Sequence, residues 1–409
     1  MESTAHNPNE RTLENGHAAE SGHRKERAGI LLMNTGSPDA PTPEAVREYL
    51  AQFLMDDRIR PLPKPIWKVI LHCFILGKRS VKSAAKYQMI WDSETGSPLL
   101  AHASMLAAKT QSELSAQGFD AKVEPAMAYG HPSVADALAR LREAGCTRLV
   151  AVPLYPQSAL STTGALTDAL ETALAAERDR GWDAPCTAAA PYSTHPLYIR
   201  AIADSIRAAG FDAESAHAAD PMHVMLSFHS IPISDTEKGD TYPEQARATA
   251  DAVFAELGIT ASASKDTSAE DESANAPAGY LAFQSRFEDA RAWVSPFTPE
   301  VLKEIAQEGG HVLFVCPGFS LDCLETIYDI DCEIEPAFMS ACDLEGAVDL
   351  LEQHHACKIV RQRDLAEREL FVGEFVHAAA YASAAAHHER DLADAGEHER
   401  IHAHGDAFA

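Results

Sequence analysis

Short apolar runs alternate with helical patterns along most of this chain, and this alternation limits the possible folds more than any other feature. An apolar run at 28–34 is followed at 42–50 by a helical segment, with Thr42 in the position of an N-cap. Further strand-like runs lie at 121–127 and 147–154, and each is followed by a helical segment. Near-continuous apolar strands separated by helices are typical of a parallel sheet covered on both faces.

The same rhythm restarts after about residue 190. Strand-like runs end at His229, Gln284 and Cys316, and helical segments lie at 242–257 and 298–308. We therefore expect an α/β fold of two similar Rossmann-like halves, each a parallel sheet flanked by helices, with a cleft between them. In open sheets of this kind, ligands bind beyond the carboxyl ends of the strands.

The boundaries predicted from this pattern divide the 409 residues into four parts. Residues 1–26 are predicted to be a disordered N-terminal extension, 27–190 the first half, and 191–345 the second half. Within the second half, 259–278 is of low complexity and charged, which favours a disordered insertion. Residues 346–409 are predicted to hold a divergent C-terminal helix and a tail rich in Ala and His.

Composition excludes several classes of protein. The apolar content of 46% is enough for a large buried core, whereas the formal net charge of −27 opposes binding to nucleic acid. No apolar stretch approaches the roughly 18 residues that cross a bilayer. The first 26 residues lack the apolar core of a secretory signal, so we expect a cytoplasmic protein.

The eight cysteines include no CxxC pair, which favours free thiols in a cytoplasmic chain. Five of them lie between 316 and 357, so a [2Fe-2S] cluster stays open as the less favoured alternative. No firm cofactor is therefore expected.

Chemically active side chains fall where two of the predicted strands end. His229 ends one strand, and beyond the strand that ends at Cys316 three carboxylates recur at every fourth residue, at Glu325, Asp329 and Glu333. On an α-helix this spacing places them on one face, a turn apart. An imidazole can accept a proton or bind a divalent metal, and neighbouring carboxylates can pass protons or a cation. The alternatives, a structural histidine and a solvated helix face, stay open at this point, although apolar residues between the acids, such as Leu324 and Ile327, argue against a wholly exposed helix.

The most apolar stretch runs from Ile66 to Leu76 and is followed by Lys78, Arg79 and Lys82. It is too short to span a membrane. Two interpretations remain for it, a core helix and an exposed apolar lip that touches a membrane or an apolar ligand.

Ordered stretches over about 28–335 resemble the ferrochelatase family, in its bacterial type. The matching stretches are 32–39 (LMNTGSPD), 49–56, 96–99 (GSPL), 127–132 (MAYGHP), 154–157 (LYPQ), 161–163 (STT), 227–232 (SFHSIP), 239–243 (GDTYP), 283–287 (FQSRF), Trp293 with Pro296, and 316–326 (CPGFSLDCLET). They occur in family order, and their combination is far more specific than any one of them.

The resemblance implies a metal chelatase, a lyase of haem biosynthesis that forms nitrogen–metal bonds. It would insert Fe²⁺ into protoporphyrin IX or coproporphyrin III and release two protons. By position, His229 and Glu325 are implied as catalytic residues and iron ligands, with Asp329 and Glu333 as a proton or metal path behind them. The porphyrin and ferrous iron are the implied partners.

The resemblance also implies a porphyrin pocket. Its implied residues are Tyr129, Ser161, Thr162, Ser227 and Trp293. The segment from Ile66 to Leu76 falls where the family carries an apolar lip, which favours the lip interpretation and a peripheral membrane contact. Leu160 stands where animal-type members place a cluster cysteine, which argues against their iron–sulfur cluster.

Two other functions stay open from the sequence. One is a chelatase for another metal or tetrapyrrole, which shares the two-half fold. The other is a non-enzymatic carrier of a tetrapyrrole or metal, because the C-terminal sequence departs from the family pattern. The presence of both His229 and Glu325 favours an enzyme.

Overall fold

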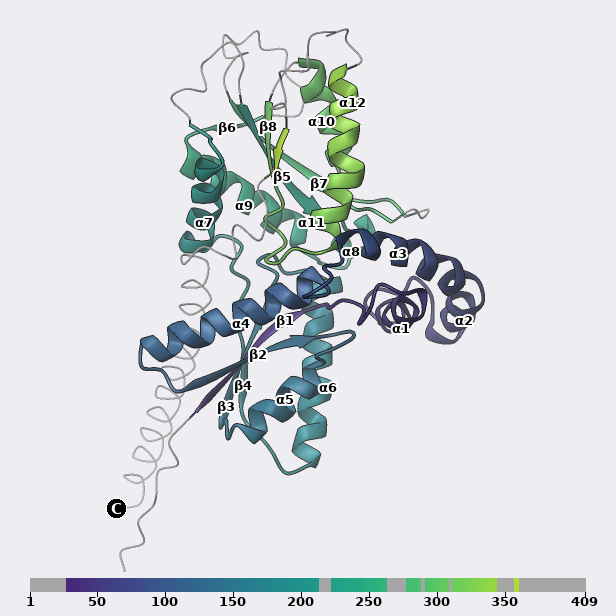
Figure 1. Ribbon diagram of the computed structural model, residues 1–409, viewed down its shortest axis with the longest axis vertical. Coiled ribbons are helices and arrows are strands. Elements are labelled where there is room, and N and C mark those ends of the chain that lie inside the picture. Colours follow the sequence, from purple (N-terminus) through teal and green to yellow (C-terminus); the bar gives the residue numbers. More distant parts are fainter. Residues whose placement is uncertain are drawn as a thin grey trace, which may run out of the picture.

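The computed structural model describes residues 27–212, 222–262, 277–287, 291–308, 311–343 and 357–359. Within these ranges the chain forms two parallel β-sheets, each flanked by helices, which lie one above the other in Figure 1. This arrangement confirms the fold class predicted from the sequence.

The first sheet has the strand order β2-β1-β3-β4, and β1 pairs in parallel with both β2 and β3. Its strands are β1 (Ala28–Asn34), β2 (Ala121–Met127), β3 (Arg148–Pro153) and β4 (Cys186–Ala188). The second sheet has the order β6-β7-β5-β8-β9, again all parallel. Its strands are β5 (Met222–His229), β6 (Thr260–Ala261), β7 (Ala278–Gln284), β8 (His311–Val315) and β9 (Cys357–Ile359).

Helices connect the strands and cover the sheets. The helices of the first part are α1 (Pro43–Phe53), α2 (Lys64–Ile70), the π-helix η1 (Leu71–Ile75), α3 (Leu76–Ile90), α4 (Pro98–Ala116), α5 (Val134–Glu143), the π-helix η2 (Leu160–Gly164) and α6 (Ala165–Asp179). Those of the second part are α7 (Pro196–Ala208), α8 (Ile233–Thr236), α9 (Tyr242–Leu257), α10 (Thr298–Glu308), α11 (Leu324–Tyr328), the π-helix η4 (Asp329–Ile334) and α12 (Glu335–Asp343).

Successive residues of β1 pack on opposite faces of the first sheet, because side chains alternate along a strand. Ile30 and Leu32 join a hydrophobic cluster with α4, whereas Leu31 and Met33 join a second cluster with α5 and α6. All four side chains are almost fully buried. A strand covered on both sides explains why its sequence is apolar without a break.

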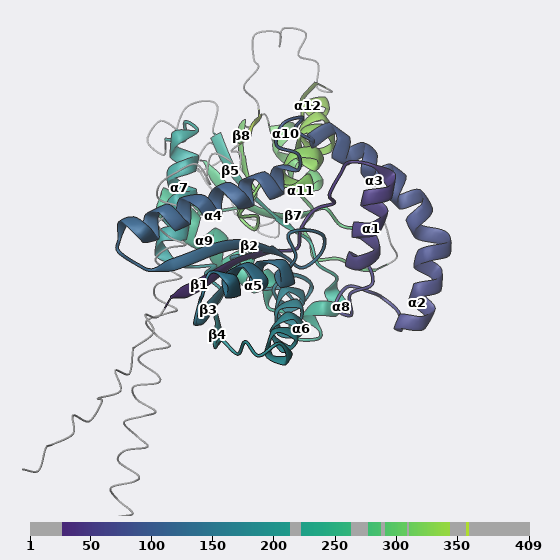
Figure 2. The same cartoon turned by 60° about the horizontal axis from the view of Figure 1, so that its bottom comes forward.

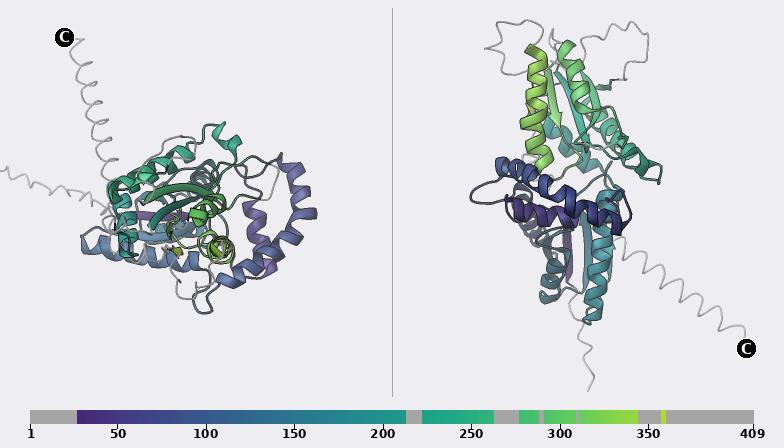
Figure 3. Two further views of the ribbon diagram at one scale, coloured as in Figure 1. Left: turned by 90° about the horizontal axis from the view of Figure 1, so that it is seen from above. Right: turned by 90° about the vertical axis from the view of Figure 1, so that its right-hand side faces the viewer.

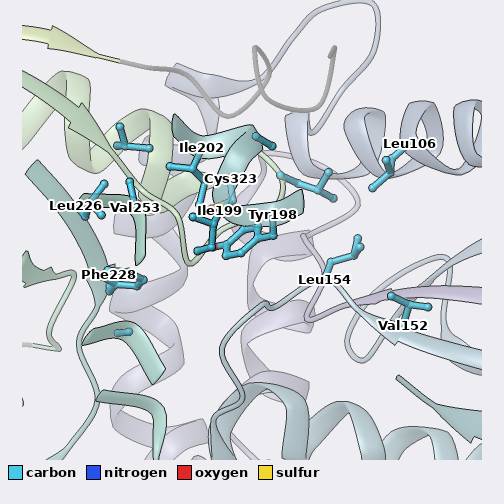
Figure 4. Close-up of a cluster of buried hydrophobic side chains, with 14 of the residues drawn as sticks. Leu106, Val152, Leu154, Tyr198, Ile199, Ile202, Leu226, Phe228, Val253 and Cys323 are labelled. Carbon is cyan, nitrogen blue, oxygen red and sulfur yellow. The ribbon is translucent and has the colours of Figure 1, made fainter. Parts of the chain in front are cut away.

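One hydrophobic cluster joins the two halves (Figure 4). It combines Leu106 and Leu154 of the first half with Ile199, Leu226 and Phe228 of the second. Burial of these side chains stabilises the contact between the sheets as well as each sheet, since the free energy follows the apolar area removed from water. The two sheets are therefore held against each other by a shared core.

The helices α1, α2, η1 and α3 form an arm, residues 43–90, that stands to one side of the two sheets (Figures 1, 2 and 3). As the sequence predicts, Thr42 caps α1, and its hydroxyl accepts a hydrogen bond from the Ala45 N–H at 3.3 Å. The far end of α3 contacts α11 of the second half. The arm therefore reaches across from one half to the other.

Two segments differ from the boundaries predicted from the sequence. β6 lies inside 259–278, where a disordered insertion was expected, and pairing with β7 orders its backbone; residues 263–276 lie outside the described part. β9 lies inside the expected C-terminal helix and tail at 346–409 and adds a strand beside β8. The rest of that tail and the extension at 1–26 also lie outside the described residues. No helix within the described ranges is long and apolar enough to cross a membrane.

Candidate active site

A cavity opens where the carboxyl ends of both sheets meet, which confirms the predicted cleft. Its wall includes Asn34 at the end of β1, Tyr155 after β3, His229 at the end of β5, and Glu325 at the start of α11. Parallel strands bring such residues together although they are far apart in the sequence, because their carboxyl ends share one edge. Both His229 and Glu325 therefore lie where the sequence predicts a site.

His229 is held in one tautomer by its own loop. Its Nδ1 lies 2.6 Å from the carbonyl oxygen of Ser230. A carbonyl only accepts hydrogen bonds, so Nδ1 must donate, and in the neutral ring Nε2 keeps its lone pair. The rings of Phe287 and Phe319 lie 6.5 and 6.4 Å from the imidazole. The result is an oriented imidazole, with Nε2 available for a proton or a metal.

Glu325 is positioned by a buried hydrogen-bond chain from the second sheet. The Nε2 of Gln284 donates to the main-chain oxygen of Glu325 at 3.0 Å. Gln284 is held in turn by the hydroxyl of Ser227, which donates to its Oε1 at 2.6 Å. The side chain of Thr298 lies 2.7 Å from the Ser227 hydroxyl. These contacts fix the first turn of α11, and with it the place of the carboxylate.

Glu325, Asp329 and Glu333, predicted to share one face of an α-helix, do not lie on a single α-helix. α11 ends at Tyr328, and Asp329 to Ile334 form the π-helix η4, whose wider turn rotates each later side chain away from the α-helical position. Asp329 is mostly buried, whereas the side chain of Glu333 is 51% exposed. The three acids therefore lie in a sequence from the cavity toward solvent.

Asp329 has partners from two other elements. The hydroxyl of Ser285, just after β7, donates to its Oδ2 at 2.7 Å. Ser285 has a φ of 59°, a left-handed backbone conformation that is uncommon outside glycine. Burial raises the pKa of Asp329 to about 6, the negative charge of Glu325 adds to the rise, and Ser285 and Lys86 oppose it. This carboxyl can therefore change protonation near neutral pH.

Lys86 of α3 is a functional candidate that sequence reasoning missed. Its Nζ lies 2.8 Å from Oε1 of Glu333 and 3.6 Å from Oδ1 of Asp329. The same ammonium lies 4.4 Å from the centre of the Tyr328 ring. Lys86 and Glu333 are 247 residues apart, so no local pattern could reveal the pair.

Three of the five predicted pocket residues line the cavity. They are Ser161, Thr162 and Trp293. Ser227 does not line it, because it is completely buried beneath Gln284 and supports the wall from behind. Tyr129 does not line it either: it is buried against Phe53 of the arm, with ring centres 5.4 Å apart. The structure thus corrects the assignment of these two side chains to the pocket wall.

Three cavity-wall residues that the sequence analysis did not assign to the pocket, Arg79, Phe287 and Arg291, lie beside one another or beside the predicted Trp293. The guanidinium of Arg79 lies 4.9 Å from the ring centre of Phe287, and that of Arg291 lies 5.0 Å from the ring centre of Trp293. All four side chains line the cavity. Flat apolar rings beside fixed positive charges suit a flat ligand that carries acidic groups.

Neutral groups surround Glu325. Burial is the main cause that raises the pKa values of the Tyr49 and Tyr87 hydroxyls and of the Cys323 thiol, and the charge of Glu325 raises all three further. The Cys323 thiol also hydrogen-bonds the Glu325 side chain. These groups therefore stay protonated at neutral pH. Glu325 consequently presents its carboxylate to a cavity whose nearby phenols and thiol do not compete for a cation.

The cysteines and acids of the described residues do not form a resident metal centre. Six described cysteines are free, and no three His, Cys, Asp or Glu side chains within the described ranges are close enough to hold a metal ion. The side chains of Cys342 and Cys357 lie outside that part, so the expectation about a cluster stays a prediction.

Comparison with known proteins agrees with the geometry. Residues 27–345 match the family model described as Ferrochelatase. A ferrochelatase of Pectobacterium atrosepticum is 36% identical over 321 residues, which cover 78% of this chain and 91% of the relative. A ferrochelatase of Bordetella parapertussis is 39% identical over 316 residues, covering 77% and 80%.

Solved structures with a similar course of the chain include SirB from Bacillus subtilis with Fe³⁺, at a TM-score of 0.47 and 11% identity, covering 88% of this chain and 98% of that one. Another is a multi-domain protein of Deinococcus radiodurans, DR2241, at a TM-score of 0.43 and 13% identity, covering 87% and 55%.

The two-sheet fold, its shared cavity and the family match define a metal chelatase, an enzyme of the lyase class. Within that class the match covers most of the chain, and both relatives exceed 30% identity over most of their length. The chain belongs to the ferrochelatase family, whose activity is the insertion of iron into a porphyrin in haem biosynthesis.

Proposed function

We propose that this protein inserts Fe²⁺ into protoporphyrin IX or coproporphyrin III, with His229 and Glu325 as the residues that act on the reacting atoms. Two pyrrole N–H bonds break, the nitrogens bind iron, and two protons leave. The observation that carries the proposal is that His229, at the end of β5, and Glu325, at the start of α11, line one cavity with aromatic rings and arginines.

His229 is proposed as the first acceptor of a pyrrole proton or as a ligand of the entering iron. Its hydrogen bond to Ser230 leaves Nε2 as the basic atom, so the ring needs no rearrangement before it reacts. Glu325 is proposed as the partner carboxylate that binds iron or accepts a proton. Asp329 and Glu333 are proposed to continue that path toward solvent.

The cavity wall supports a flat, acidic macrocycle as substrate. Phe287, Phe319 and Trp293 offer apolar ring surface, and Arg79 and Arg291 offer positive charge for carboxylates of the macrocycle. Protoporphyrin IX and coproporphyrin III share the flat ring and differ in the number of carboxylates. The ratio of kcat/KM for the two porphyrins identifies the substrate.

We also propose that the arm contacts a membrane surface or another apolar partner. Phe74 is 73% exposed, Val69 58% and Ile66 56%, and Lys64 and Lys68 lie beside them. Apolar side chains bordered by lysines suit an interface with anionic lipid. Sedimentation with anionic vesicles tests this, and Phe74→Glu should reduce the bound fraction by severalfold.

The central experiment is anaerobic Fe²⁺ insertion followed by absorbance, with each porphyrin in turn. His229→Ala and Glu325→Gln should each lower kcat/KM at least about 100-fold, the usual range for removing a general base. His72→Ala and Glu304→Gln alter exposed residues of the same types away from the cavity and serve as matched controls. Turnover of His229→Ala at the wild-type rate would refute the proposed mechanism.

The same assay separates the two alternative functions. A chelatase for another metal or tetrapyrrole would show little Fe²⁺ insertion with either porphyrin and would turn over with cobalt or nickel. A carrier would bind a porphyrin, seen as a shifted absorbance band, without inserting any metal. Binding without insertion in the wild-type protein would therefore replace the proposed enzyme by a carrier.

A further inference from the structure

An ammonium group from the first half lies between two carboxylates of the second half. Lys86 on α3 contacts both Asp329 and Glu333 on η4, at 3.6 and 2.8 Å. The Lys86 side chain is 22% exposed, and its position is fixed further by the Tyr328 ring, 4.4 Å from the ammonium. The Lys86 ammonium is therefore confined by three groups on the path proposed for cations, unlike a lysine in an exposed surface ion pair.

The ammonium of Lys86 occupies a position beside two carboxylates that would also suit a divalent cation. Carboxylate oxygens are typical ligands of Mn²⁺ and similar ions. With the lysine present, the two negative charges are half neutralised by one positive charge. Without it, a divalent ion could replace the ammonium and bind both acids, with the Ser285 hydroxyl beside Asp329.

We propose that Lys86 is a positioning residue that competes with divalent cations for Asp329 and Glu333, so that iron passes along these acids without being trapped. The inference rests on the proposed function, because it takes these two carboxylates as part of the path to Glu325. It adds a residue of the arm to that path and assigns it a role in releasing the metal.

Binding of Mn²⁺ tests this without turnover. Free Mn²⁺ is measured by electron paramagnetic resonance during titration of the full-length protein. Lys86→Met should bind Mn²⁺ at least 10-fold more tightly than the wild type, whereas Lys86→Arg should bind it as the wild type does. Lys78→Met removes the same charge from an exposed position of α3 and should leave the affinity unchanged.

A double variant locates the new binding. In Lys86→Met/Glu333→Gln one of the two carboxylates is lost as well, so the gain in Mn²⁺ affinity should disappear. In the iron-insertion assay, Lys86→Met should lower the KM for Fe²⁺ and lower kcat at least threefold, with the KM for the porphyrin unchanged. A fall of both kinetic constants together is the signature of a metal held too tightly.

The inference is overturned if Lys86→Met, folded as judged by its melting temperature, binds Mn²⁺ no more tightly than the wild type. It is also overturned if the double variant keeps the tighter binding. Lys86→Gln replaces Lys86→Met if the latter does not fold. Failure of the proposed function is seen separately, as a wild-type protein that inserts no iron, while the Mn²⁺ titrations still decide the role of Lys86.

Discussion

Replacing Asp329 by Asn should make the stability of this protein depend less on pH. Burial raises the pKa of this carboxyl from 3.8 to about 6 in the folded protein. Because the pKa is raised, the contribution of this one carboxyl to the stability of the wild type is most favourable below 3.8, where the group is protonated in both the folded and the unfolded state. That stability is lost as the pH rises through about 6, because the folded protein must then hold a buried charge. Asparagine never carries the charge.

The size of the effect follows from the two pKa values. Each pKa unit corresponds to about 1.4 kcal/mol, so the difference between 3.8 and about 6 corresponds to about 3 kcal/mol above pH 7. Some of this cost is already present at pH 4. Between pH 4 and 7.5, the free energy of unfolding of Asp329→Asn relative to the wild type should therefore rise by about 2–3 kcal/mol. The asparagine keeps an oxygen that can accept from Ser285, so the comparison isolates the charge.

The assay is thermal or urea unfolding of both proteins at several pH values, with a chelator present so that no metal binds the acids. Asp39→Asn removes one negative charge from an exposed loop and is the matched control. We expect the advantage of Asp329→Asn to grow across the window from 3.8 to 6 and to level off above it. A difference between the two proteins that is the same at pH 4 and 7.5 would refute this reasoning.

Three further substitutions test the packing around the site. Ser227→Ala should lower kcat severalfold with little change in the KM for the porphyrin, because it releases Gln284 behind the wall without touching the cavity; an altered porphyrin KM would contradict this. Leu226→Ala should lower the free energy of unfolding by about 2–5 kcal/mol in urea denaturation, since it opens a space in the core shared by both halves. Gly36→Ala should lower both the melting temperature and activity, because Gly36 has a φ of 106° and an added Cβ would lie 2.1 Å from the Tyr129 carbonyl oxygen; wild-type values would show that this loop adapts.

Local sequence patterns predicted the elements well where one local force dominates. Largely apolar runs predicted β1 and β5, because most side chains of a strand that is buried on both faces pack in the core. A threonine before a proline predicted the start of α1, because both residues suit the first turn of a helix. The same patterns placed His229 at the end of one strand and Glu325 beyond the end of another, and both line one cavity in the structure.

Prediction failed where the spacing of residues in the sequence was the only guide to the backbone conformation or to the direction of a side chain. Glu325, Asp329 and Glu333 are four residues apart in the sequence whether the backbone is an α-helix or a π-helix, and only the observed backbone shows that η4 begins at Asp329. The motif containing Ser227 marked an important residue correctly, but its side chain faces Gln284 and the interior. The direction in which a strand residue points, toward the cavity or toward the interior, depends on which elements cover each face of the sheet. A local motif does not contain this information.

The two-half α/β fold, the family and the two residues that we propose for the chemistry could be predicted from the amino-acid sequence, because caps, apolar periods and ordered motifs act over a few residues. The groups that surround those two residues could be identified only from the folded chain. The contacts of Lys86 with Glu333 and of Arg79 with Phe287 join residues about 200 or more positions apart, and each depends on how the arm lies against the second half. Such contacts follow from the packing of whole elements, which fixes distances that no short stretch of sequence contains.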